Sequence, residues 1–273
     1  MKTIGIYVRP FLLSIAFAAG SLSIASAANA ALQYSGLAEI EFTGINVCAG
    51  QGQCNGVNTL GNNYTVSSVA SIFDSGFSQS GDGFADFFIS LLPTADWAID
   101  DSFYQTSESY GDAGLSPNAS GIASSFADTD FAILFENRSH GQSLGGPTLR
   151  FDLLFTAFVS ADIIFQNTVG SFSDGGAYAA ITLFDLLDNE LFFSSAEAFI
   201  GGPLVDSNFQ EITLSFILEP GQSKTILGNV YSDGYAEVAA PPAVWLMGIG
   251  LMGISLFARK TAHRSRVNSQ NMQ

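Results

Sequence analysis

Residues 149–160 read Leu-Arg-Phe-Asp-Leu-Leu-Phe-Thr-Ala-Phe-Val-Ser, and this stretch decides the fold class. Apolar side chains recur at every second position from Leu149 to Val159, while Arg150 and Asp152 fall on the opposite face. Successive side chains of a strand point to opposite faces of a sheet. The period of two therefore predicts a β-strand with one face in a hydrophobic core.

The same alternation returns at residues 212–218, where Ile, Leu, Phe and Leu occupy every second position. Pro220 and Gly221 then stand at the two central positions of a type II turn. This turn predicts a hairpin whose returning strand covers residues 223–231.

Shorter apolar stretches bounded by Gly, Ser, Asn and Asp predict further strands at residues 37–42, 84–91, 131–135, 178–187 and 191–199. Phenylalanine is abundant, at 24 residues, while charged residues form only 12% of the chain. We therefore expect an all-β, jelly-roll-like β-sandwich with an aromatic core. A short helix at residues 93–99 and long loops at 50–82 and 105–125 are the expected interruptions.

The N-terminal 30 residues have the three parts of a secretory signal peptide. Lys2 and Arg9 give a positive start, an apolar run follows, and small residues offer cleavage after Ala27 or Ala30. An uncleaved anchor is the alternative. Export through the Sec machinery and signal peptidase is therefore expected, followed by one domain over residues 31–237.

Cys48 and Cys54 are the two cysteines of the chain, and the five residues between them are flexible enough to close a small ring. In an oxidising compartment this spacing predicts a disulfide. A zinc site is disfavoured, because no third Cys or nearby His completes a tetrahedral shell.

The C-terminal segment, residues 238–273, has the composition of a membrane span followed by basic residues. Residues 243–258 carry no charge, and as a helix they would extend about 24 Å. Trp245 stands where an interfacial aromatic would lie, and the basic tail 259–273 begins with Arg259 and Lys260. A plain C-terminal anchor would have these features, but it needs no prolines before the span.

This segment resembles the PEP-CTERM sorting signal, in the variant that reads V-P-x-P-x-A-x-W-L before a glycine-spaced span and a basic cluster. The matching residues are Val238, Pro241, Ala243, Trp245, Leu246, Gly248, Gly250, Leu251, Gly253, Arg259 and Lys260, with Pro242 beside the second proline.

The resemblance implies recognition by exosortase, a membrane-embedded cysteine protease that removes the span in Gram-negative bacteria that make exopolysaccharide. In this scheme Pro241, Pro242 and Trp245 are read by the protease. The glycines pack in its membrane site, and the basic pair stops transfer.

All 25 acidic residues fall within residues 31–237, against only three of the nine basic residues. A surface this negative repels nucleic acid and anionic lipid. The expected contact with a membrane is therefore the transient one made by the C-terminal tail. We expect no enzyme. Gly141–Gly145 matches the nucleophile-elbow pattern around Ser143, but a strand rather than a helix follows it, and no His follows within the domain.

The expected function is an exported surface or extracellular-matrix protein associated with exopolysaccharide and biofilm. The first alternative is a carbohydrate-binding module, with Trp97, Tyr104, Tyr110 and Tyr178 as candidate sugar-contacting rings. The second is a polysaccharide hydrolase, which would need two suitably spaced carboxylates. No cofactor is expected.

Calcium is the one metal that the composition favours, although no site can be assigned. The densest acidic groups are Asp100 with Asp101, Asp128 with Asp130, and Asp185 with Asp188 and Glu190.

Overall fold

A computed structural model describes residues 31–50, 63–98, 101–114, 120–139, 146–166 and 173–239. The strands of these residues are β1 (Ala31–Ala49), β2 (Tyr64–Gly81), β3 (Gly83–Ser90), β4 (Phe103–Ala113), β5 (Gly121–Asn137), β6 (Leu149–Gln166), β7 (Ser173–Asp185), β8 (Glu190–Phe199), β9 (Val205–Leu218) and β10 (Ser223–Val238).

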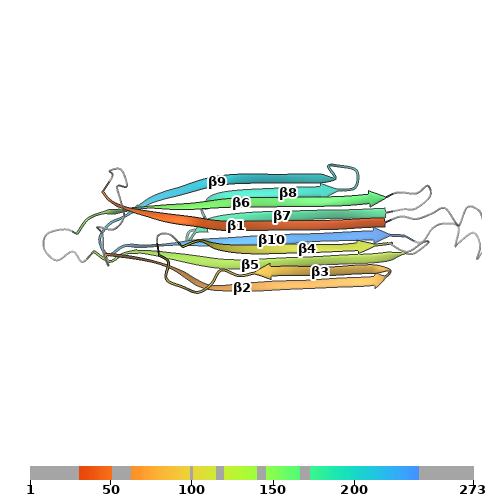
Figure 1. Cartoon of the computed structure of the whole chain (residues 1–273), viewed down its shortest axis with the longest axis horizontal. Coiled ribbons are helices and arrows are strands. Elements are labelled where there is room, and N and C mark those ends of the chain that lie inside the picture. The colour runs from red at the N-terminus through yellow and green to blue at the C-terminus, as the bar shows by residue number, and fades with distance from the viewer. Residues whose placement is uncertain are drawn as a thin grey trace, which may run out of the picture.

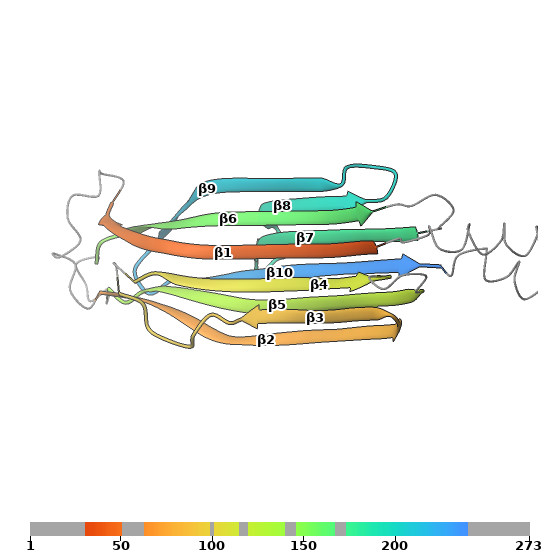
Figure 2. The same cartoon turned by 45° about the vertical axis from the view of Figure 1, so that its right-hand side comes forward.

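These strands form two five-stranded antiparallel sheets packed face to face, as the β-sandwich prediction requires. Sheet A has the order β3-β4-β1-β6-β9, and sheet B has the order β2-β5-β10-β7-β8. The strands of both sheets run along the long axis of the domain (Figures 1 and 2). The central strands β1 and β10 pack against each other across the interior.

The stretch that decided the fold class lies in β6, between β1 and β9. Its alternating apolar side chains, from Leu149 to Val159, are all at most 1% exposed. The other strands expected from alternation are also present, although β7 ends at Asp185, two residues before the predicted end.

The prediction of long loops at residues 50–82 and 105–125 is wrong for most of these residues. β2, β4 and the start of β5 occupy them, while residues 51–62 and 115–119 lie outside the described part. The reason is visible in β4, whose inward side chains Gln105, Ser107 and Ser109 are polar yet fully buried. A hydrophobicity pattern cannot detect such a strand, because its neighbours rather than its composition hold it in place.

The turn at residues 219–222 is confirmed, but the predicted hairpin is wrong. Gly221 has φ of +79°, and the N–H of Gln222 donates to the carbonyl of Glu219 at 3.0 Å. β9 pairs with β6 in sheet A, whereas β10 pairs with β5 and β7 in sheet B. The turn therefore carries the chain from one sheet to the other.

Asn137, at the end of β5, fastens this crossing between the sheets. It is 1% exposed, and its Nδ2 donates to the carbonyls of Leu218 at 2.9 Å and Pro147 at 3.0 Å. Its backbone carbonyl accepts from the N–H of Gly221 at 2.8 Å. Asn137 thus holds the end of β9 and the turn against sheet B.

The helix expected at residues 93–99 is absent from its described part, residues 93–98. Instead this segment runs beside β2, where the N–H of Trp97 donates to the carbonyl of Val66 at 2.8 Å. The indole Nε1–H donates to Ser68 Oγ at 3.1 Å, and the ring is 6% exposed. Burial of this one large ring outweighs the weak helical preference of the segment.

The core has two unlike halves. The aromatic half is built from two groups of rings, in each of which every ring centroid lies within 6 Å of another. One group is Phe42, Trp97, Phe103, Phe131, Phe155 and Phe192, and the other is Phe135, Phe151 and Phe216. The small-residue half is built from inward Gly, Ala and Ser, namely Gly36, Ser107, Ser109, Ala123, Ser125, Ala127, Ala161, Ala177, Ala179, Ala198, Ser232 and Gly234.

Candidate functional site

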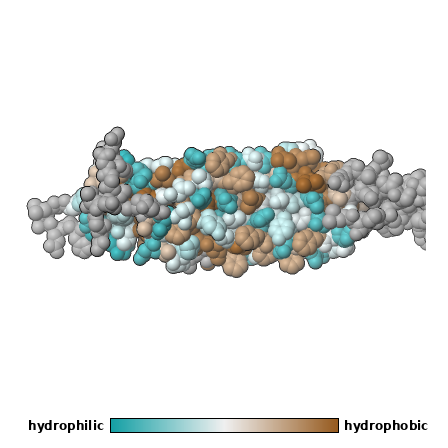
Figure 3. All heavy atoms as spheres, in the orientation of Figure 1, coloured by the Kyte–Doolittle hydropathy of each residue, from teal (hydrophilic) through white to brown (hydrophobic). Residues whose placement is uncertain are grey.

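The outer face of sheet A mixes exposed aromatic rings with carboxylates. Phe84 and Phe88 on β3, Tyr104 on β4 and Phe209 on β9 are each about half exposed or more. Carboxylates alternate with them on the same face, at Glu39, Glu41, Asp86, Glu108, Asp112 and Asp162. The space-filling view shows apolar and hydrophilic side chains interspersed along the whole visible face (Figure 3).

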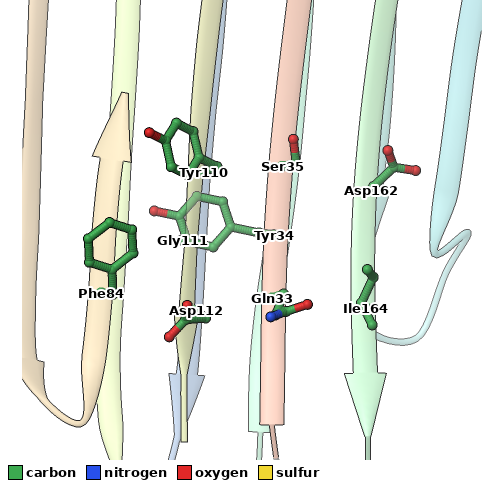
Figure 4. A pocket seen from close by; sticks show the side chains of 9 residues that line it. All are labelled: Gln33, Tyr34, Ser35, Phe84, Tyr110, Gly111, Asp112, Asp162 and Ile164. Carbon is green, nitrogen blue, oxygen red and sulfur yellow. The ribbon is translucent and has the colours of Figure 1, made fainter. Parts of the chain in front are cut away.

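A shallow groove of about 230 Å³ lies on this face, near the N-terminal end of β1. Its lining comes from four strands of sheet A, and Figure 4 shows the residues: Gln33, Tyr34, Ser35, Phe84, Tyr110, Gly111, Asp112, Asp162 and Ile164.

The groove exists because the short side chain of Ser35 on β1 lies between longer ones on the two neighbouring strands. Ser35 pairs with Tyr110 on one side and Asp162 on the other, and Gln33 pairs likewise with Asp112 and Ile164. Two strand spacings place these walls roughly 10 Å apart. The floor is thus polar, and one wall is aromatic.

The aromatic wall is a pair of rings from β3 and β4. The ring centroids of Phe84 and Tyr110 lie 6.4 Å apart, and the Tyr110 hydroxyl donates to Asp86 Oδ2 at 3.3 Å. Burial, together with the charge of Asp86, raises the pKa of Tyr110. The phenol therefore stays protonated at neutral pH, with its hydroxyl directed at Asp86.

The carboxylates of the groove act as hydrogen-bond acceptors. Burial first, and the charge of Asp82 second, raise the pKa of Asp112. Asp162 Oδ2 accepts from Ser160 Oγ at 3.2 Å. Among the described residues no Lys or Arg lines the groove, so no basic side chain there neutralises its carboxylates.

The three basic residues of the domain lie outside the groove, and each has a partner. Arg138 pairs with Glu136 at 2.8 Å, Arg150 pairs with Asp152 at 3.0 Å, and Lys224 Nζ lies 5.3 Å from the centroid of the Phe216 ring. The groove therefore keeps its negative potential, which disfavours anionic ligands.

Of the four rings proposed for sugar contact, the structure places two on this face, six residues apart, and only Tyr110 lines the groove. Tyr104 and Tyr110 both point outward from β4. Trp97 is a correction, because it is buried 5.3 Å from Phe42 and 4.9 Å from Phe103 and cannot meet a ligand. Tyr178 lies on the other side of the molecule, on sheet B.

Sequence reasoning missed the other residues of the groove. Asp112 and Gln33 lie 79 positions apart but are register partners. The alternation in residues 84–91 could have marked Phe84 as outward, since Ala85 is the small buried residue beside it. Ile164 and Asp162 gave no signal, because only pairing of β6 with β1 brings them to the groove.

The acidic groups considered for calcium are engaged in local hydrogen bonds. Asn229 Nδ2 donates to Asp128 at 2.6 Å and to Asp130 at 2.9 Å, and the side chain of Asp185 accepts from Leu187 and Asn189. Within the described part of the chain, no group of three or more His, Cys, Asp or Glu is placed to hold a metal ion. Asp100 lies outside that part.

Most residues of the terminal signals lie outside the described residues. These are the signal peptide 1–30 and, in the tail, Pro241, Pro242, Ala243, Trp245, Gly248, Gly250, Gly253, Arg259 and Lys260; Ser143 of the nucleophile-elbow pattern is outside as well. Val238 is described: it is 2% exposed and pairs with Gly121 and Ser173, so it belongs to β10. Among the described residues no helix is long and apolar enough to cross a membrane.

Cys48, at the end of β1, is 4% exposed and disulfide-bonded. Cys54, the other cysteine of the sequence, lies outside the described residues.

No protein-family model matches this chain, and no curated protein matches it. The solved structures that match are only weakly similar, and two of them serve as examples. One is the enzymatically active domain of tailspike protein 4 of bacteriophage CBA120, with 11% identity, 60% of this chain and 19% of that chain covered, and a TM-score of 0.11. The other is a chain of a chaperone–tip adhesin complex of CFA/I fimbriae biogenesis, with 10% identity, 73% and 91% covered, and a TM-score of 0.09. Scores this low support no conclusion about fold or function.

Proposed function

We propose that this chain is an exported, non-enzymatic protein that binds neutral polysaccharide through the outer face of sheet A. The observation that carries the proposal is the groove in which Phe84 and Tyr110 stand beside Gln33, Ser35, Asp112 and Asp162. Binding sites commonly combine apolar walls with a few placed polar groups that fix the ligand's orientation.

The chemistry of the groove suits a sugar ring better than other ligand classes. Aromatic rings present flat apolar surface to the C–H groups of a pyranose. Asp112 and Asp162 accept hydrogen bonds from hydroxyl groups, and Gln33 can both donate and accept. An anionic polymer would be repelled, because Asp112 and Asp162 line the groove and none of the three basic side chains of the domain does.

Delivery to the outside is the second part of the proposal. The tripartite N-terminus and the PEP-CTERM-like tail support export, passage through a membrane-anchored intermediate, and release by exosortase to the cell surface or exopolysaccharide matrix. Pro241 and Pro242 follow β10 by only a few residues, which would leave the cleavage region just beyond the last strand. For the exported domain itself, we also propose that the sandwich is of the jelly-roll type.

The binding test is affinity electrophoresis of the secreted protein in gels that contain neutral or anionic polysaccharide. We expect retardation only in the neutral gel, and about tenfold weaker binding after Phe84→Ala with Tyr110→Ala, since each ring contact contributes about 0.5–1.5 kcal/mol. Leu187→Ala, in an exposed turn on the other sheet, is the matched control. Equal retardation of the double variant and the wild type would refute the site.

The sorting test is the intact mass of the exported protein. We expect a C-terminus near residue 240, and a full-length membrane-bound species after Pro241→Ala, Pro242→Ala and Trp245→Ala are combined. If the wild-type protein keeps its full length in the membrane, the tail is a plain membrane anchor and the sorting proposal is wrong.

A further inference from the structure

The outer face of sheet B carries a second aromatic–acidic patch that the groove on sheet A does not include. A transverse row crosses four strands of this sheet: Phe126 on β5 pairs with Asp233 on β10, which pairs with Tyr178 on β7, which pairs with Glu197 on β8. Tyr231 and Tyr235 flank Asp233 on the same face of β10. We call these residues the sheet B patch.

Two rings of the patch lie across glycines of the neighbouring strands. A Cβ atom on Gly76 would stand 2.9 Å from the Phe126 ring, and one on Gly176 would stand 3.1 Å from the Tyr235 ring. The glycines leave room for the rings to lie over the sheet, where a larger side chain would push them upright. Tyr235 keeps 42% of its surface exposed in this position.

The centre of the patch is a carboxylate surrounded by phenols. The Tyr178 and Tyr231 ring centroids lie 6.1 Å apart. Burial raises the pKa of Asp233, although a hydrogen bond from Tyr231 opposes the shift, and burial raises the pKa of Tyr231 to about 12. At neutral pH the patch therefore offers protonated phenol hydroxyls beside the carboxyl groups of Asp233 and Glu197, between aromatic rings.

The two faces point in opposite directions because they are the two outer sides of one sandwich (Figures 1 and 2). Both combine rings with carboxylates, and the three basic side chains of the domain are engaged with other groups. The same ligand chemistry therefore fits both sides, and one ligand chain cannot cover both at once without wrapping around an edge.

We propose that the sheet B patch is a second site for neutral polysaccharide, so that a single domain bridges two polymer chains. This inference rests on the proposed function, because it extends sugar binding from sheet A to the opposite side. The protein would then act as a cross-linker of its matrix.

The test uses the full secreted chain and, as probe, the extracellular polysaccharide of the producing culture, freed of anionic polymer by ion exchange. The particle size of the polymer is followed by light scattering while protein is added. A bivalent protein gives a maximum at intermediate protein and a decline in excess, because saturated sites no longer bridge. Binding stoichiometry is measured separately by calorimetry.

Three variants separate the outcomes. Tyr178→Ala with Tyr231→Ala removes the two central rings of the sheet B patch, and Phe84→Ala with Tyr110→Ala removes the two rings of the sheet A groove. The quadruple variant removes all four. We expect each double variant to bind with half the wild-type stoichiometry and to lose bridging, and the quadruple variant to lose binding. Leu187→Ala is the control, and circular dichroism confirms that each variant is folded.

The remaining outcomes overturn the second site alone or the proposed function together with it. If the sheet B variant still bridges polymer chains as the wild type does, for instance because the protein forms dimers, the second site is wrong. Complete loss of binding by the sheet A variant also overturns it, while the proposed function stands. Failure of the folded wild type to bind the polysaccharide overturns the proposed function itself, and the second site with it.

Discussion

The two halves of the core solve the same packing problem in opposite ways. In the aromatic half the space between the sheets is filled by rings, for instance Phe151 of sheet A, whose centroid lies 5.7 Å from that of Phe135 of sheet B. In the small-residue half the backbones themselves approach, since a Cβ atom on Gly36 would lie 2.7 Å from the carbonyl oxygen of Tyr178. One half is therefore sensitive to loss of volume and the other to its addition.

The small-residue half is also held by hydrogen bonds between the sheets. Ser107 Oγ donates to the carbonyl of Ala127 at 2.5 Å, and the Tyr34 hydroxyl and Ser125 Oγ lie 2.8 Å apart. These bonds satisfy polar groups that have left water, as buried groups require. In this half, specificity of strand pairing comes from polar contacts as well as from apolar area.

The largest effect is expected from adding volume in the small-residue half, where the backbones of the two sheets are in close contact. Gly36→Val places atoms against the carbonyl oxygens of Tyr178 and Asp233, which belong to the opposite sheet and cannot rotate away. We expect a loss of stability greater than for any deletion in the aromatic half, and no folded protein by circular dichroism.

Gly176→Ala is the matched control for added volume. Its new Cβ would come closest to the Tyr235 ring, at 3.1 Å, which can move outward, and would lie in ordinary contact with the Ala198 carbonyl oxygen at 3.5 Å. A folded Gly36→Val protein of normal thermal stability would show that the sheets are not in close contact there.

Removing volume tests the aromatic half. Phe151→Ala deletes a fully buried ring that contacts Tyr64, Phe135 and Phe216. We expect the free energy of unfolding to fall by about 3–5 kcal/mol, measured by chemical denaturation. Phe209→Ala, a 60% exposed ring on β9, should change it by less than about 1 kcal/mol. Similar values for the two substitutions would contradict the assignment of the core.

A smaller effect is expected from one polar contact of the small-residue half. Tyr34→Phe removes the hydroxyl that meets Ser125 Oγ but keeps the ring, which lies against Gly111 and Gly234. We expect a loss of about 1 kcal/mol in the free energy of unfolding. A gain in stability would mean that the buried hydroxyl destabilises this half.

The pH dependence gives the finest comparison. Burial raises the pKa of Tyr34 from 10.0 to about 12, so the unfolded chain loses this proton at lower pH than the folded one. The contribution of Tyr34 to stability is therefore complete below pH 10 and is lost as the pH rises toward 12. Denaturation at pH 9 to 12 should show a smaller decline for Tyr34→Phe than for the wild type. If the stability of both proteins declines equally with pH, the decline comes from groups other than Tyr34.

Particular residues show how far the sequence could be read. The alternation from Leu149 to Val159 predicted β6, because period-two apolar spacing is a local property of strands. β4 was not predicted, since its inward residues Gln105, Ser107 and Ser109 look like those of a loop. Their burial depends on contacts with Thr129 and Ala127 of the opposite sheet, which local patterns do not contain.

The candidate site divides in the same manner. Tyr110 and Tyr104 could be named as possible ligand contacts from residue type, but Trp97 was named by the same reasoning and is buried. Residue type gives the chemistry that a side chain can offer. It does not say which surface the side chain reaches.

By itself, the sequence determined the all-β class, the type II turn at residues 219–222 and the excess of acidic residues in the domain, because each follows from local spacing or from composition. Only the tertiary structure decided that this turn joins two sheets, that polar strands line half of the core, and that Phe84, Gln33 and Asp162 meet in one groove. The physical reason is that strand pairing joins residues far apart in the chain, and the free energy of those contacts depends on the whole sandwich rather than on any single segment.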